Sequence, residues 1–85
     1  MNWRIYVRGK AKKQLKRLPK DFIQAIEKAI DEMSINPYSG DVNKMSGEEN
    51  VWRRRVGNYR IKFEIYEAER LIYVFEIQRR TSNTY

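Results

Sequence analysis

Basic residues recur in the second half of the chain at a spacing suited to binding an anion. If Gly57-Asn58 forms a two-residue hairpin loop, Arg55 lies opposite Arg60 and Arg53 lies opposite Lys62. Strand alternation then places all four cations on one face of the sheet. Like charges directly opposite each other destabilise a hairpin, by up to about 1 kcal/mol per pair. The pattern therefore favours a face that binds an anion over a solvated face whose long side chains splay into water.

The residue types that are absent narrow the chemistry further. The chain contains no histidine and no cysteine. Histidine is the commonest general base and metal ligand, and without it neither a Ser-His nor a Cys-His nucleophile pair can form. Disulfides and thiolate metal sites are excluded as well. We therefore expect no metal or other cofactor, and any catalysis would depend on arginine, lysine, tyrosine and carboxylates.

Size and charge predict one small domain, residues 1–85, with a polyanionic partner. The chain has 18 Lys and Arg against 11 Asp and Glu, a formal net charge of +7. Aromatic residues make up 13% of the chain, which is enough apolar mass for a folded core. The partner would be a nucleic acid or an acidic protein. No stretch approaches the ~20 apolar residues of a membrane span, and the N-terminus lacks a signal-peptide pattern, so a cytoplasmic protein without membrane partners is expected.

The elements that must position these residues follow from hydrophobic periodicity. Residues 2–8 alternate as a strand, and residues 10–18 and 20–34 carry apolar stripes typical of amphipathic helices, separated at Pro19. Residues 51–56, 59–66 and 71–79 are expected to be strands. The predicted order is βααβββ. This is an α+β fold: an antiparallel β-sheet with an N-terminal α-helical hairpin packed on one face.

The register of the last hairpin depends on whether its loop has an odd or an even number of residues. A three-residue loop would place Phe63 opposite Tyr73 and Ile61 opposite Phe75, which keeps the aromatic residues in the core. The same register would place Glu76 opposite Arg60 on the charged face. Ile72 and Val74 would then also point to the charged face, although both are too apolar for open water.

Three segments together carry a resemblance to a known family. They are Trp52 to Arg60 (WRRRVGNYR), Ile77 to Arg80 followed by Tyr85, and Lys10 to Pro19 after the opening strand. With these segments the chain resembles the RelE/ParE toxin superfamily over essentially its whole length. The resemblance implies a toxin of a type II toxin–antitoxin pair. RelE-type members enter the ribosomal A site and cut mRNA, whereas ParE-type members share the fold but poison DNA gyrase.

The resemblance also implies a mechanism and roles for single residues. Family RNA cleavage is metal-free: the ribose 2′-OH attacks the adjacent phosphate and leaves a cyclic phosphate and a free 5′-OH. Arg53 and Arg55 match the basic pair of a strand, and Arg60 matches the arginine expected to clamp the scissile phosphate. Arg80, or alternatively Arg79, matches the arginine expected near the leaving group.

The proton acceptor stays open between two residues. Tyr85 matches the terminal tyrosine of the family, which stacks on a base or shares in proton transfer. Glu76 is the other candidate, with a salt bridge to Arg60 as the alternative role. Lys62 is expected to bind substrate.

The remaining expectations concern partners. Lys13 and its neighbouring cations on the first helix form either a solvated face or a contact to rRNA phosphates. An acidic cognate antitoxin would cover the basic face, with Ile72 and Val74 as apolar contacts. Arg60, Arg80 and Tyr85 together favour cleavage of ribosome-bound mRNA over gyrase inhibition. A degenerate member that only binds its partner is the third possibility.

Overall fold

The computed structural model describes residues 2–79 and builds them into two helices and five strands. The elements in chain order are β1 (Arg4–Val7), α1 (Gly9–Lys16), α2 (Lys20–Ile35), β2 (Val42–Lys44), β3 (Val51–Val56), β4 (Tyr59–Tyr66) and β5 (Leu71–Arg79). The predicted α+β class and the helical hairpin are confirmed. The short strand β2, in the segment expected to be a loop, is an addition to the predicted order.

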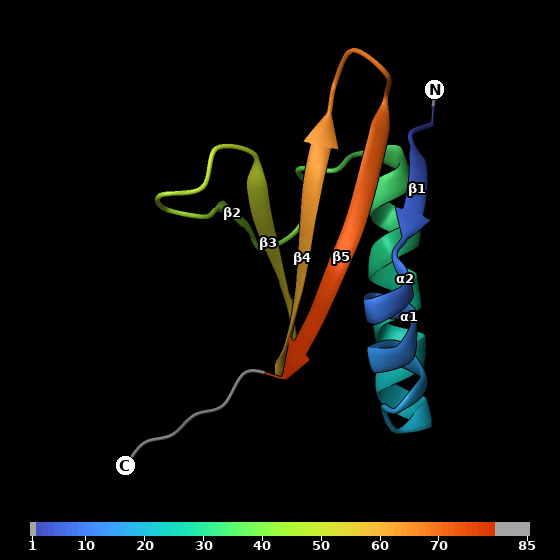
Figure 1. The fold of residues 1–85 in the computed structure, drawn as a ribbon. Coiled ribbons are helices and arrows are strands. Elements are labelled where there is room, and N and C mark those ends of the chain that lie inside the picture. The colour runs from blue at the N-terminus through green and yellow to red at the C-terminus, as the bar shows by residue number, and fades with distance from the viewer. Residues whose placement is uncertain (1, 80–85) are drawn as a thin grey trace.

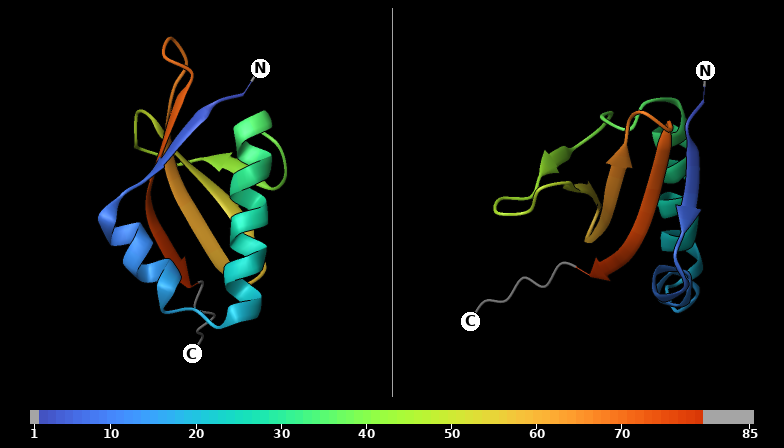
Figure 2. Two further views of the ribbon diagram at one scale, coloured as in Figure 1. Left: turned by 90° about the vertical axis from the view of Figure 1, so that its right-hand side faces the viewer. Right: turned by 45° about the horizontal axis from the view of Figure 1, so that its top comes forward.

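One mixed sheet carries all five strands, in the order β1-β5-β4-β3-β2. The β3–β4 and β4–β5 pairs are antiparallel, as expected, and the added strand β2 is also antiparallel to β3. β1 differs, because it pairs in parallel with β5. A parallel neighbour requires a long crossover, and the chain between β1 and β5 supplies it. Both helices lie against the same side of the sheet (Figures 1 and 2). The opposite side, which we call the outer face, has no helix on it among the described residues.

The helices are short amphipathic segments whose apolar sides face the sheet. α1 stops ahead of Leu18-Pro19, because a residue that precedes proline is disfavoured in the helical region. α2 begins directly after Pro19, with Asp21 in its first turn, where a negative charge complements the helix dipole. Its buried residues are Ile26, Ala29 and Met33, which all belong to the predicted stripe.

The register of β3 with β4 agrees with the sequence prediction. Val56 pairs with Tyr59, Arg55 with Arg60 and Arg53 with Lys62. Gly57 has a φ of 57°, the left-handed conformation that a two-residue hairpin turn requires at its first central position. β4 then buries every second residue against the helices: Tyr59, Ile61, Phe63 and Ile65.

The register of β4 with β5 differs from the prediction. Tyr66 pairs with Leu71, so the turn spans four residues rather than three. The even loop places Ile72 and Val74 opposite Ile65 and Phe63, and both are fully buried in the core. The predictions that Ile72 and Val74 lie on the charged face and that Tyr73 and Phe75 belong to the core were therefore wrong.

A bulge further along β5 then changes which residues face the core. The register shifts between Lys62 and Phe63, after which Ile61 pairs with Ile77 and Lys62 pairs with Glu76. An extra residue on one strand moves the following side chains to the other face. Glu76 therefore lies on the outer face as predicted, but opposite Lys62 rather than Arg60.

Arg54 is the one charged residue of the described chain that is buried, and it fixes β3 to α2. Its guanidinium forms a salt bridge with Glu32, and Nη1 donates a hydrogen bond to the Ala29 carbonyl at 3.4 Å. Gly40, with a φ of 79°, lies against the same guanidinium. Because side chains alternate along β3, anchoring Arg54 on the helix side holds Arg53 and Arg55 on the outer face.

Candidate functional site

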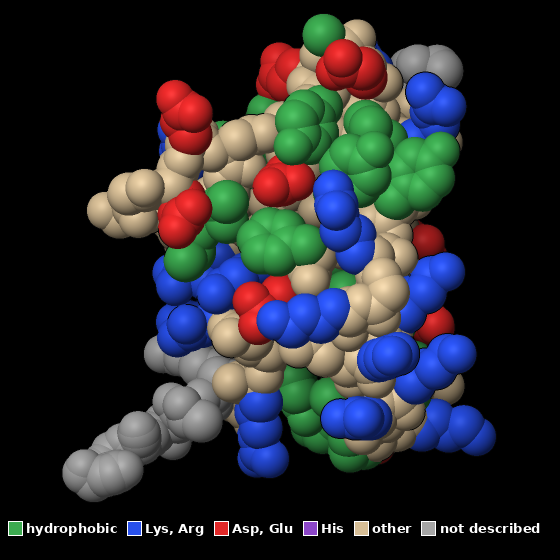
Figure 3. Space-filling view, viewed as in Figure 1, with side chains coloured by type: hydrophobic (Ala, Val, Ile, Leu, Met, Phe, Trp, Pro, Cys, Tyr) green, Lys and Arg blue, Asp and Glu red, His purple; other side chains and the backbone are tan. Residues whose placement is uncertain are grey.

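Four cations form a compact group on the outer face, and we call it the basic face: Arg53, Arg55, Arg60 and Lys62. The two cross-strand pairs Arg55–Arg60 and Arg53–Lys62 lie next to each other on the β3–β4 hairpin. The structure thus brings together four of the residues that the sequence singled out. Figure 3 shows Lys and Arg side chains over much of the lower half of the molecule, below a group of hydrophobic side chains.

The charges of the basic face are only partly compensated. Nε of Arg55 lies 3.9 Å from an Asp41 oxygen, in a loose ion pair between two side chains that are about half exposed. Nζ of Lys62 lies 3.6 Å from a Glu76 oxygen. Within residues 2–79, neither Arg53 nor Arg60 forms an ion pair. These two arginines therefore carry charge that an anionic ligand would neutralise.

Glu76 lies at the border of this group and is held from three sides. Its carboxylate lies 3.4 Å from Lys10 Nζ and 3.6 Å from Lys62 Nζ, and it accepts a hydrogen bond from Gln78 Nε2 at 3.0 Å. The side chain is only 17% exposed. The arrangement joins α1 to the basic face and fixes the position of Lys62.

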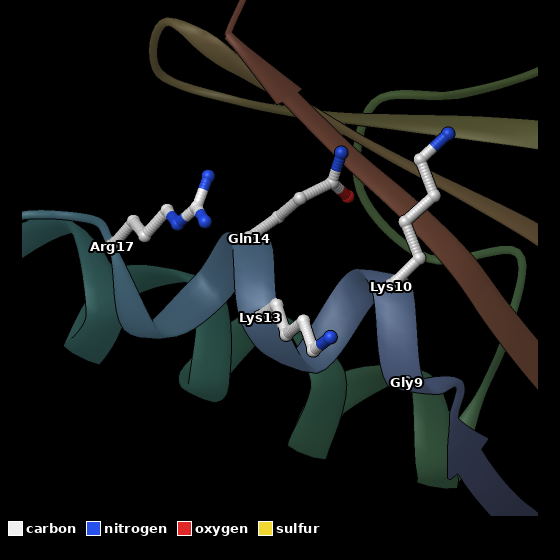
Figure 4. Close-up of a pocket in the computed structure, with 5 residues that line it drawn as sticks. All are labelled: Gly9, Lys10, Lys13, Gln14 and Arg17. Atoms are coloured by element: carbon white, nitrogen blue, oxygen red, sulfur yellow. The ribbon is translucent and has the colours of Figure 1, made fainter.

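Lys13 lies elsewhere, on α1. Together with Gly9, Lys10, Gln14 and Arg17 it lines a shallow cleft of about 510 Å³. Figure 4 shows Lys10, Gln14 and Arg17 rising from the same side of the helix. Oε1 of Gln14 accepts a hydrogen bond from the Ile77 backbone N–H at 2.7 Å, so this cleft is anchored to β5. The cleft offers three cations to a polyanion at the flank of the basic face.

The remaining candidate residues are separated from this group or lie outside the described chain. Arg79 pairs with the buried Tyr59, so its side chain leaves β5 on the helix side and not on the outer face. Arg80 and Tyr85 lie outside the described residues.

The sequence analysis missed a group of tyrosines on the other half of the outer face. Tyr6 stacks on Tyr73 with ring centroids 5.7 Å apart, and Tyr66 meets Tyr73 edge-on at 5.6 Å. The guanidinium of Arg8 lies 4.5 Å from the centroid of the Tyr73 ring. Tyr66 donates a hydrogen bond to Glu64, which raises the pKa of that tyrosine. We call Tyr6, Tyr66 and Tyr73 the tyrosine cluster. The predicted register of the last hairpin placed Tyr73 in the core, so the cluster was not recognised from the sequence.

Residues 2–79 were also compared with the requirements of a metal site and of a membrane-spanning helix. They contain no group of three or more His, Cys, Asp or Glu side chains placed to bind a metal ion. In the same part of the chain, neither helix has the length and apolar character that a membrane crossing requires.

A family model and a related protein both match this chain over most of its length. The family model described as the ParE toxin of the type II toxin–antitoxin system parDE matches residues 5–84. A protein of Methanocaldococcus jannaschii designated RelE1 is 25% identical over 83 residues, which cover 94% of this chain and 92% of that protein.

Solved structures of RelE–RelB complexes share the fold. The chain aligns with the archaeal RelE–RelB complex from Pyrococcus horikoshii with a TM-score of 0.85 and 23% identity, over 98% of this chain and 100% of that one. It aligns with the RelB–RelE complex from Methanococcus jannaschii with a TM-score of 0.73 and 27% identity, over 87% and 88%. Sequence and fold agree, and the chain belongs to the RelE/ParE superfamily of toxins from toxin–antitoxin systems.

Proposed function

We propose that this toxin is an endoribonuclease that cuts mRNA on the ribosome and so inhibits translation. The observation that carries the proposal is the basic face, where two arginines without a carboxylate partner among the described residues lie beside two further cations. The β3–β4 hairpin holds the four side chains, and Arg54 anchors that hairpin to α2. Preorganised cations of this kind stabilise the negative charge that develops during cleavage of a phosphodiester.

The proposed reaction is attack by the ribose 2′-oxygen on the adjacent phosphorus. The bond from phosphorus to the 5′-oxygen breaks, which leaves a 2′,3′-cyclic phosphate and a 5′-hydroxyl. Arg55 and Arg60 would bind the scissile phosphate and its dianionic intermediate, since guanidinium groups bind phosphate oxygens in a bidentate manner. Arg53 and Lys62 form the next pair, about 7 Å further along the strands. This spacing allows the second pair to bind a neighbouring phosphate.

Proton transfer is assigned by elimination and by the family resemblance. Lys10, Lys62 and Gln78 hold the Glu76 carboxylate, which favours a role in positioning Lys62 over that of proton acceptor. We therefore assign Tyr85 to proton transfer or to stacking on a base, and Arg80 to the leaving 5′-oxygen. Arg79 is the weaker choice for that second role, because it leaves β5 on the helix side.

The partners follow from the same proposal. The α1 cleft, with Lys13 and Arg17, would contact rRNA phosphates when the toxin is on the ribosome. A cognate acidic antitoxin would neutralise the basic face. The proposal also implies a cytoplasmic protein, since its substrate is mRNA under translation.

Inhibition of DNA gyrase is the second candidate function. It is favoured by one observation, that the matching family model is described as a ParE toxin. In this alternative the basic face is a binding surface that performs no nuclease chemistry.

Pulse induction of the toxin followed by mapping of mRNA 5′ ends separates the two functions. The test variant is Arg55→Gln with Arg60→Gln, and the control is Lys28→Gln with Lys44→Gln, which removes two positive charges from α2 and β2. We expect translation-dependent cuts from the wild type and the control. The test variant should cut at least about 100-fold less, as when a catalytic oxyanion donor is removed.

The outcome that contradicts the proposal is growth arrest with intact mRNA and accumulating DNA breaks, which would identify gyrase as the target. Equal cutting by the test variant would show that the basic face is not the site of cleavage.

A further inference from the structure

The tyrosine cluster is an exposed apolar surface on a sheet face that the described helices leave uncovered. Tyr6 is 51% exposed and Tyr66 is 37% exposed, and partly exposed Leu71 lies opposite Tyr66. Figure 3 shows hydrophobic side chains gathered in the upper half of the molecule, with most of the Lys and Arg side chains below them. Contiguous apolar surface of this kind on a small protein marks docking sites. Tyrosine is also among the residues that contribute most to protein–protein affinity.

The surroundings of the cluster favour a protein partner over RNA. Glu64 accepts the hydrogen bond from Tyr66, and the adjoining turn between β4 and β5 contains Glu69. These carboxylates repel a phosphate backbone. Tyr6 already stacks on Tyr73 and Arg8 lies over the same ring, so Tyr73 has less free ring surface on which a base could stack.

The cluster and the basic face are neighbours on a single surface. Tyr66 and Arg60 are the same-side residues at the two ends of β4, six positions apart, which corresponds to about 20 Å. One partner segment that covers both would need about six residues as a strand or about 13 residues as a helix. Its chemistry follows from charge complementarity: apolar side chains over the tyrosines, and carboxylates over the arginines.

We infer that the tyrosine cluster is the docking surface for the apolar half of an amphipathic acidic segment of the cognate antitoxin. The acidic half of the segment reaches the basic face and neutralises it. This inference rests on the proposed function for the identity of the partner. It adds that antitoxin affinity and RNA cleavage are separable, because the tyrosines serve only the antitoxin while the basic face serves both.

The test measures antitoxin affinity and mRNA cleavage in the same variants. The antitoxin is identified by its ability to restore growth to cells that produce the toxin, and its affinity for the full-length toxin is measured by titration calorimetry. The variants are Tyr6→Ser and Tyr6→Ser with Tyr66→Ser. The control is Ile35→Ser on α2, because Ile35 is a similarly exposed apolar residue, 69% exposed, away from the outer face. Thermal unfolding verifies that each variant is folded.

We expect Tyr6→Ser to weaken antitoxin binding about tenfold or more, and the double variant about 100-fold. Ile35→Ser should change the affinity by less than about twofold, as is usual for a surface residue outside the interface. All three folded variants should cut mRNA as the wild type does when the antitoxin is absent.

Wild-type affinity in the folded double variant would overturn the inference. Loss of cleavage with unchanged antitoxin affinity would also overturn it, and would place RNA on the tyrosines instead. If the wild type cuts no mRNA but its antitoxin still depends on the tyrosines, the proposed nuclease function fails while this inference stands.

Discussion

Replacing Gly40 by alanine should destabilise the protein more than the same replacement at Gly47, although the two backbones are alike. Gly40 has a φ of 79° and Gly47 a φ of 80°, and an L-residue in this left-handed region costs about 1–2 kcal/mol. A Cβ on Gly47 would meet nothing within 4 Å. A Cβ on Gly40 would lie 2.8 Å from Cζ of Arg54, which is closer than two such atoms can approach.

The guanidinium of Arg54 cannot move away without cost. It is bound to Glu32 and to the Ala29 carbonyl, so a shift would break the contacts of a buried cation. Overpacking of this kind adds about 1–3 kcal/mol. We therefore expect a loss of about 1–2 kcal/mol for Gly47→Ala and of about 2–5 kcal/mol for Gly40→Ala.

Urea unfolding at equilibrium measures both losses, as a shift of the midpoint at constant slope. A double-mutant cycle that combines Gly40→Ala with Arg54→Met then tests the cause, because methionine lacks the planar head that clashes with the new methyl group. Equal losses at the two glycines would refute the reasoning. So would a Gly40→Ala loss that is the same with arginine or methionine at position 54.

Substitutions at three other places have expected outcomes that follow from contacts in the structure. Gln14→Leu leaves a backbone N–H of β5 without its acceptor and should lower the free energy of unfolding by about 1–3 kcal/mol; Gln14→Glu, which keeps an acceptor oxygen, should lose less in the same urea titration. Tyr38 donates a hydrogen bond to Glu67, which raises its pKa to about 12. The unfolded chain then loses this proton first, so the free energy of unfolding should fall as the pH rises from 10 to 12, and Tyr38→Phe should lack that part of the fall. Lys13→Ala with Arg17→Ala should make the slope of log K against log salt for RNA binding shallower, by about 0.7 for each phosphate that the variant no longer binds; an unchanged slope would show that the α1 cleft does not bind RNA.

The sequence was sufficient for the β3–β4 hairpin because its register depends on local chemistry. A glycine that can adopt a positive φ, two residues between the strands and a strict alternation leave only one pairing that buries the apolar side chains. Arg53, Arg55, Arg60 and Lys62 were therefore placed correctly relative to one another.

The β4–β5 hairpin shows the limit of the same reasoning. Arg70 adopts a φ of 54° and closes a four-residue turn, although neither glycine nor asparagine marks the position. The bulge beside Lys62 then compensates for the changed parity further along β5. A prediction from the number of loop residues assumes that one register holds along the whole hairpin. The longer turn and the bulge shift the register in opposite senses, so strand alternation alone cannot reveal them. The apolar residues on both faces of β5 made either register acceptable.

Tertiary contacts were beyond prediction for a different reason. Arg54 is bound by Glu32, which lies 22 positions away on α2, and no local pattern links the two residues. The parallel pairing of β1 with β5 joins the two ends of the fold and leaves no local signal in either strand. The tyrosine cluster depends on that pairing, because Tyr6 reaches Tyr73 only when β1 lies beside β5.

Successive arginines of β3 point to opposite sides of the sheet and differ in how their charge is compensated. On β3, Arg54 faces α2 and has its charge compensated inside the fold, whereas Arg53 and Arg55 face outward beside cations of β4. The outward pairs oppose folding, because like charges lie directly across from each other. Such an arrangement is favourable only when an anion occupies the face, and ligand binding then stabilises the folded state. In the proposed function, RNA and an acidic antitoxin segment would compete for the same uncompensated charge, while only the protein partner has apolar side chains to offer the tyrosines. Under the proposed function, that difference would allow an antitoxin to bind tightly to a surface that must also release RNA after each cut.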